Sequence, residues 1–372
     1  MTTVTSTVRD IRLDLFRGIA LWFIFLDHIP GHAIAQLTIR NFGFSDATEI
    51  FVFISGYTAA LVYGKKLDAA GFAASSWQVL RRVWQLYIAH ILLFIIYIAQ
   101  ISWIAERYNN PVLLDALNVN RFLLSPGQSL VEALTLQYRP VNLDILPLYM
   151  ALLLFFPVVL WLIERSPLLA LGGSLTLYGV VQWFKVAFPV YEDGSTWYFN
   201  PLGWQLLFVL GALLARSPQF SVLSRWRGWL AGLAAGFLVF SLLIVLSWKN
   251  PELASWVPRW LANLIYPIDK TNMGPMRLLH FLAIAYLISN WLGKTHSCLQ
   301  WRIWRPAILC GQHSLQVFCV GISLSFLAYF VLVQFGRNLG LQVAIAIAGL
   351  IIMTALARAL EAVRQPVIQA KT

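Results

Sequence analysis

Apolar segments long enough to cross a membrane recur along the whole chain. A helix needs about 20 apolar residues to cross a hydrocarbon core about 30 Å thick. The candidate spans are 13–30, 46–64, 79–104, 142–164, 167–187, 199–215, 228–248, 277–293, 308–333 and 339–358. We therefore expect an all-α fold, a polytopic membrane helix bundle of about ten transmembrane helices, in which residues 1–372 form one integral-membrane domain.

Charged and polar residues interrupt the first apolar segment at Asp14, Arg17, Asp27 and His28. Such residues are costly in a membrane unless they face a protein interior or a water-filled cavity, so they indicate a functional site. At about 100° per residue, Arg17 and His28 share one helix face and lie about 16 Å apart along the axis. Asp14 can pair with Arg17 one turn later. The alternative is a snorkelling arginine with an interfacial histidine.

Composition supports a membrane protein, since 59% of residues are hydrophobic, 12% are charged and the mean hydropathy is +0.71. The first span could be a cleaved signal sequence, but Asp27, His28 and Pro30 would precede the cleavage site, so we expect it to stay attached. The three cysteines lack metal-ligand spacing, and we expect neither a disulfide framework nor a metal site.

The basic residues predict the orientation of the chain. If the N-terminus is cytoplasmic, most of the 27 Lys and Arg residues fall in inner segments, so we expect both termini in the cytoplasm. The net charge of +11 then follows mainly from topology. Nucleic-acid binding usually needs a soluble basic domain, and the sequence shows none. The outer segments 105–141, 188–198 and 249–276 are rich in Asn, Pro, Gly and aromatic residues, and we expect them to cover an external substrate.

Several motifs occur together. The Arg17-x10-His28 spacing and the string at 49–57 resemble the opening of the membrane acyltransferase-three superfamily. Strings at 27–30, 143–149, 275–281 and 311–318 extend the similarity over most of the chain and resemble its OpgC branch. One departure concerns the start of the third span. Many superfamily members have Arg-x-x-Arg there, whereas this chain has Arg81-Arg82-Val-Trp-Gln85.

The resemblance implies O-acylation of a carbohydrate outside a bacterial inner (cytoplasmic) membrane, with a cytoplasmic acyl-CoA as donor. For the OpgC branch it implies a succinyl group and a periplasmic glucan acceptor. We therefore expect an O-succinyltransferase that uses succinyl-CoA as a substrate, holds no bound cofactor and contacts membrane lipids, with self-association left open. The alternatives are acylation of another envelope polysaccharide or lipid-linked sugar, and a transporter of an anionic solute.

Acyl transfer to a hydroxyl requires a group that accepts the hydroxyl proton, and His28 is the candidate base. A carboxylate can orient its ring, and the candidates are Asp27, Asp46, Glu49 and Asp144. Asp46 and Glu49 have a competing role as caps of the second span, and the alternative for Asp144 is a buried structural pair. A covalent intermediate on Ser55 or His28 is a further alternative, although Ser-Gly at 55–56 is more typical of close helix packing.

Binding residues follow from charge and position. The phosphates of an acyl-CoA favour a basic donor site, for which Arg17, Arg81 and Arg82 are candidates, with positive-inside anchoring as the alternative for the last two. His313 is a donor-site candidate whose alternative is hydrogen-bonded packing.

The acceptor-site candidates come from the outer ends of spans. Arg277 and His280 lie one turn apart and can contact a sugar or a carboxylate, or anchor a helix end. Asp46 is a further candidate. Aromatic residues beside the outer segments can stack on a sugar. They are Trp183, Trp197, Tyr198 and Trp256, of which Trp197 is our choice.

Overall fold

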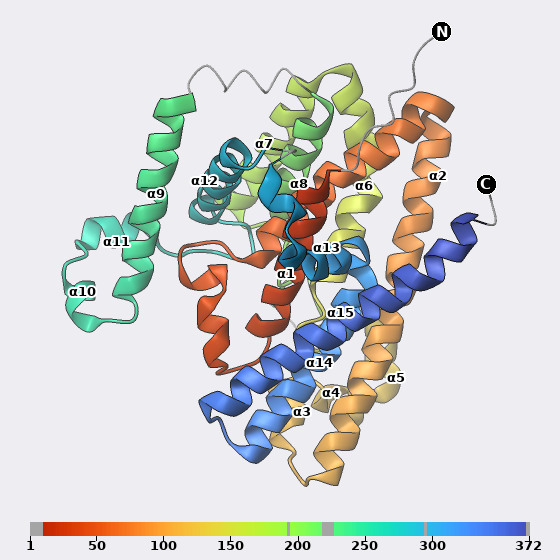
Figure 1. Ribbon diagram of the computed structural model, residues 1–372, viewed down its shortest axis with the longest axis vertical. Coiled ribbons are helices and arrows are strands. Elements are labelled where there is room, and N and C mark those ends of the chain that lie inside the picture. The colour runs from red at the N-terminus through yellow and green to blue at the C-terminus, as the bar shows by residue number, and fades with distance from the viewer. Residues whose placement is uncertain (1–9, 192–193, 218–226, 294–295, 370–372) are drawn as a thin grey trace. The chain divides into compact units, whose positions relative to one another are not determined.

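The computed structural model of the protein describes residues 10–191, 194–217, 227–293 and 296–369 (Figure 1). In these ranges the regular secondary structure is helical, and the β-type pairing consists of an isolated bridge between Pro189 and Thr196. Six of the described helices are long and apolar enough to cross a membrane. The chain is thus an all-α, multi-pass membrane protein, as predicted, while the count of ten spans stays a prediction.

One set of helices coincides closely with the expected spans. They are α1 (Ile11–Asp27), α2 (Ala47–Arg107), α6 (Ile145–Arg165), α7 (Pro167–Phe184), α8 (Pro201–Arg216), α9 (Arg227–Ser247), α12 (Pro275–Trp291), α13 (Arg305–Gln312), α14 (Ser314–Phe335) and α15 (Leu339–Gln369). The short helices are α3 (Val112–Ala116), α4 (Asn120–Leu124), α5 (Pro126–Leu134), α10 (Pro251–Ser255) and α11 (Arg259–Ile265). These short helices lie in the segments that we expect between spans.

Two expected spans, 46–64 and 79–104, are the two limbs of α2. The limbs meet at Gly71, whose φ of 78° is a conformation that glycine adopts without a Cβ clash. The Ser75 hydroxyl donates to the Tyr63 carbonyl across this bend at 2.9 Å. Figure 1 shows the α2 ribbon turning sharply between its two limbs. The expected span 308–333 is similarly divided, because the backbone leaves helical geometry at His313 between α13 and α14.

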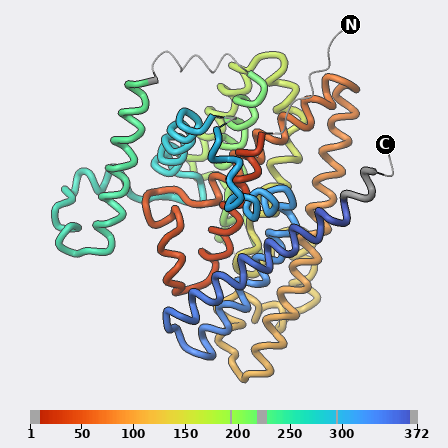
Figure 2. Tube along the Cα trace, viewed as in Figure 1, coloured from red at the N-terminus to blue at the C-terminus, as the bar shows by residue number. Residues whose placement is uncertain are grey.

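The chain forms two compact units. The first combines residues 1–38 with 285–372, and the second spans 39–284. In the first unit α1 packs against α13 and α14, which in turn contact α15. In the second, α2 packs along α8 and α6, and α7 covers α8. In Figure 2 the red and the blue ends of the trace make up the first unit.

Glycines allow the closest helix contacts inside each unit. A Cβ on Gly56 of α2 would collide with the Phe208 carbonyl of α8, and one on Gly211 would collide with the Phe53 carbonyl. Small residues permit this close approach of helices in membranes. The finding supports the packing interpretation of Ser55-Gly56.

The first unit repeats this arrangement with residues of its sequence motifs. A Cβ on Gly18, next to Arg17, would collide with the Ala307 carbonyl of α13, and one on Gly311 would collide with the Asp14 carbonyl of α1. Two strings that carry the family resemblance, one at each end of the chain, therefore pack backbone to backbone.

Replacing Gly56 with alanine should destabilise the second unit. The added methyl group would force α2 and α8 apart, and such overpacking costs about 1–3 kcal/mol. A lowered melting temperature of the purified protein in detergent would report it. Gly179→Ala is the matched control, because nothing lies within 4 Å of a Cβ built there. Equal losses in the two variants would contradict the packing argument.

Candidate functional site

The start of α2 is capped by its own carboxylates. Asp46 accepts a hydrogen bond from the Thr48 N–H at 2.8 Å, and the Glu49 carboxylate accepts one from the Asp46 N–H at 2.9 Å. This reciprocal arrangement is a capping box, which satisfies backbone donors that a helix start leaves unpaired. The capping roles that the sequence offers for Asp46 and Glu49 are therefore confirmed.

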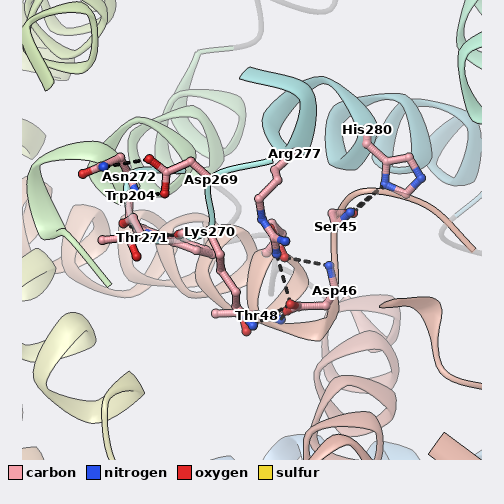
Figure 3. Close-up of polar contacts among 11 residues, drawn as sticks. Ser45, Asp46, Thr48, Trp204, Asp269, Lys270, Thr271, Asn272, Arg277 and His280 are labelled. Atoms are coloured by element: carbon pink, nitrogen blue, oxygen red, sulfur yellow. Dashed lines mark hydrogen bonds and ion pairs between the residues drawn. The ribbon is translucent and has the colours of Figure 1, made fainter. Parts of the chain in front are cut away.

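The same carboxylates bind two cations from a distant part of the chain (Figure 3). Arg277 contacts Glu49 Oε1 through Nη2 at 2.5 Å and through Nε at 2.8 Å, and it contacts Asp46 Oδ2 at 3.0 Å. Lys270 Nζ lies 2.6 Å from the same Asp46 oxygen. The Glu49 side chain is 0% exposed. Two carboxyl groups and two basic side chains thus form one connected group, called here the α2 ion cluster.

Charge pairing keeps Asp46 and Lys270 of this cluster ionised. Burial alone would raise the pKa of Asp46, but Lys270 and Arg277 hold that pKa well below its usual range. Burial alone would lower the pKa of Lys270, yet the Asp46 carboxylate raises it. Both groups therefore stay charged at neutral pH. The pairing offsets the large desolvation cost of buried charge.

His280 holds the residue just before the cluster. The Ser45 N–H donates to His280 Nδ1 at 3.2 Å, and the Ser45 hydroxyl lies 2.7 Å from the same nitrogen. Because a backbone N–H only donates, Nδ1 is the accepting nitrogen and the proton of the neutral ring sits on Nε2. Arg277 and His280 thus share a helix face, as expected, and both hold the segment at the start of α2.

The loop that carries Lys270 is itself fixed by hydrogen bonds (Figure 3). The indole of Trp204 donates to the carbonyl oxygens of Lys270 and Thr271, at 3.0 and 3.2 Å. Asn272 donates from its side chain to Asp269 at 2.7 Å. These contacts place the Lys270 ammonium group over Asp46.

A second polar group in the same unit contains two further predicted residues. Asp144 pairs with Arg139 at 2.9 Å, and the Arg139 guanidinium lies 4.7 Å from the ring centroid of Trp197, within reach of a cation–π interaction. Asp144 and Trp197 are therefore brought together by Arg139. Arg139 carries no signal in the sequence, since it lies in a connecting segment where a basic residue is common.

His90 is another residue that the sequence analysis missed. It is fully buried in the second limb of α2, and neither ring nitrogen has a hydrogen-bond partner among the described residues. Buried polar groups are normally paired, so an unpaired one needs an explanation. The available signal was a histidine inside an apolar span, which is the same signal that drew attention to His28.

In the first unit, His28 ends α1 and is half-buried. Its Nδ1 lies 2.7 Å from the Ile24 carbonyl oxygen. A carbonyl only accepts, so Nδ1 carries the proton and the lone pair of the neutral ring is on Nε2. The neighbouring Asp27 accepts from the Thr38 hydroxyl at 2.6 Å. Whether a carboxylate assists His28 stays a prediction.

The donor-site candidates are divided between the units. Arg17 is half-buried on α1, whereas Arg81 is exposed and Arg82 half-buried on α2. Arg82 donates to Gln85 at 3.3 Å, three positions on. His313 Nε2 lies 3.0 Å from Glu361, which ties the break between α13 and α14 to α15 and agrees with a packing role. No cluster of three or more metal-ligating side chains occurs in the described ranges.

The chain has helices of membrane-spanning length and buried ion pairs between them and their connecting segments. These features define a polytopic membrane protein with buried polar groups. The family model described as OpgC protein matches residues 9–365, so the chain belongs to the OpgC family. Membership in this family indicates acyltransferase activity. Comparisons with curated proteins and with solved structures gave no match.

Removing Arg277 should unfold the second unit locally, because Glu49 would remain buried without its partner. Breaking a buried pair in this way costs about 3–5 kcal/mol. Arg277→Ala should therefore lower the melting temperature strongly, and Arg277→Lys should recover only part of the loss, since lysine lacks the planar fork that binds both carboxylates.

Asp68→Asn provides the matched control for that measurement. Asp68 pairs with Arg216 at 2.8 Å, but its side chain is 53% exposed. Exposed ion pairs contribute about 1 kcal/mol or less. A loss at Asp68 as large as that at Arg277 would show that burial does not set the energy of the α2 ion cluster.

Proposed function

We propose that this protein is an integral-membrane O-acyltransferase that moves a succinyl group from cytoplasmic succinyl-CoA to hydroxyls of periplasmic glucans. The family match over residues 9–365 supports the acyltransferase class. The resemblance to the OpgC branch supplies the donor, the acceptor and the inner membrane as the location. The charge distribution supports cytoplasmic termini.

His28 is the proposed general base. A glucan hydroxyl attacks the thioester carbonyl carbon, so that a C–O bond forms and the C–S bond breaks. The hydroxyl proton passes to Nε2 of His28 and then to the departing thiolate of coenzyme A. The hydrogen bond from Nδ1 to the Ile24 carbonyl supports this role, because it leaves the accepting lone pair of the neutral ring on Nε2.

We assign donor binding to Arg17, Arg81, Arg82 and His313. Arginine binds phosphate through paired hydrogen bonds, which suits the phosphates of coenzyme A. In the proposed orientation these residues lie toward the cytoplasm, so the coenzyme need not cross the membrane. Only its acyl group would reach His28.

The acceptor side is assigned to the region around Asp46, Arg277, His280 and Trp197. Arg277 and His280 bind the α2 start in this structure, so we propose that they act by positioning that segment rather than by contacting the sugar first. Glu49 then supports Arg277. The ion pair of Asp144 with Arg139, whose guanidinium lies over Trp197, supports a role for Asp144 near that acceptor candidate.

His28→Ala should reduce acyl transfer by the amount that general bases usually supply. That contribution is about 10²–10⁴-fold. The measurement uses purified protein in detergent, labelled succinyl-CoA and unsubstituted periplasmic glucan, with label in the glucan as the readout. Transfer by the native protein distinguishes an enzyme from a carrier of anionic solutes.

His296→Ala is the histidine control. His296 is exposed, and its side chain contacts the neighbouring Cys298. This variant should transfer at the native rate, and both variants should keep the native melting temperature. Normal transfer by a folded His28→Ala variant would rule out His28 as the base.

A further inference from the structure

A polar cleft lies in the connecting segments of the second unit, with a volume of about 570 Å³. It is lined by Asp115, Asn118, Asn120, Arg121, Ser125 and Tyr191 together with the apolar Leu124. This volume falls in the range of small-molecule sites. The lining comes from residues 115–125 and from Tyr191, which lie in two segments expected from the sequence to cover an external substrate.

The lining side chains are held by one another and by Glu132, which is not part of the lining. Arg121 donates to both Glu132 oxygens, at 2.7 and 2.9 Å, and its guanidinium lies 4.0 Å from the Tyr191 ring centroid. The Asn120 amide donates to Asp115 at 2.8 Å. Because these contacts fix the side chains before any ligand arrives, a ligand would bind without a large ordering cost.

The basic side chain of the cleft, Arg121, is paired with a carboxylate, whereas the Asp115 carboxylate bonds a neutral amide. The partners are Glu132 and Asn120, so no unpaired cation of the lining faces an incoming anion. Amide, hydroxyl and carboxylate groups together offer both donors and acceptors. This lining suits an uncharged, hydroxyl-rich ligand, and it does not suit the phosphates of coenzyme A, which favour clustered cations.

Hydrogen bonds connect the cleft with two predicted site residues. The Asn118 side chain donates to the Arg139 carbonyl at 3.1 Å, and Arg139 in turn holds Asp144 and lies over Trp197. Asn118 also accepts from the Tyr191 hydroxyl at 3.3 Å. Asn118 would therefore contact both a ligand in the cleft and Arg139, which holds Asp144 and Trp197.

We propose that this cleft is a carbohydrate-binding subsite that holds a neutral segment of the acceptor glucan. The role of the subsite in acyl transfer rests on the proposed function, but binding of carbohydrate does not. The subsite would hold part of a long acceptor while another part reaches the reacting groups, and so would set which glucans are modified.

The test measures binding of unsubstituted periplasmic glucan to the full-length protein in detergent by titration calorimetry. Asn120→Ala removes the amide, and Tyr191→Phe removes one hydroxyl while keeping the ring. Losing hydrogen bonds worth about 1.4 kcal/mol weakens binding about tenfold. We expect Asn120→Ala to show that loss and Tyr191→Phe a smaller one, with the melting temperature unchanged in both.

Gln137→Ala is the matched amide control, since Gln137 is exposed in the same segment but outside the cleft lining. It should bind glucan as the native protein does. In the transfer assay the cleft variants should raise KM for glucan and leave kcat unchanged. If the native protein binds glucan but transfers no acyl group, the proposed function fails and the subsite stands.

Three results would overturn the subsite. These are no glucan binding by the native protein, equal binding by native and cleft variants, and competition for the cleft by coenzyme A.

Discussion

Buried charge must be neutralised where water is scarce, and the start of α2 is built around this constraint. Arg277 bridges Asp46 and Glu49, and Lys270 binds Asp46. The helix cap, the 269–272 loop and the start of α12 are all fixed through these ion pairs. The hydrogen bond from Ser45 to His280 extends the same attachment by one residue. Removing one charge would leave its partners buried and unpaired, so the cluster acts as a unit.

Polar chemistry is concentrated where helices end or break. His28 follows the last turn of α1, the ion cluster surrounds the first turn of α2, and His313 marks the break between α13 and α14. Helix ends offer backbone groups that need partners, and non-helical backbone at membrane depth is tolerated only inside protein or beside water. The fold therefore places these polar side chains at positions that the backbone already makes polar.

Helix type and approximate span limits could be predicted because apolar length is a local property of sequence. The caps at Asp46 and Glu49 were also within reach, since a capping box spans only a few residues. The partner of Glu49 was not, because Arg277 lies 228 positions away and tertiary packing alone brings them together. The bend of α2 at Gly71, the pairing of Asp144 with Arg139 and the burial of His90 depend on the same long-range packing.

Acyl transfer across a sealed bilayer is the decisive measurement. The protein would be reconstituted into vesicles with labelled succinyl-CoA trapped inside and unsubstituted periplasmic glucan added only outside. Labelled glucan should accumulate outside while coenzyme A stays inside, because only the acyl group passes through the protein. Label in glucan only when donor and acceptor share one compartment would contradict a reaction that joins the two sides of the membrane.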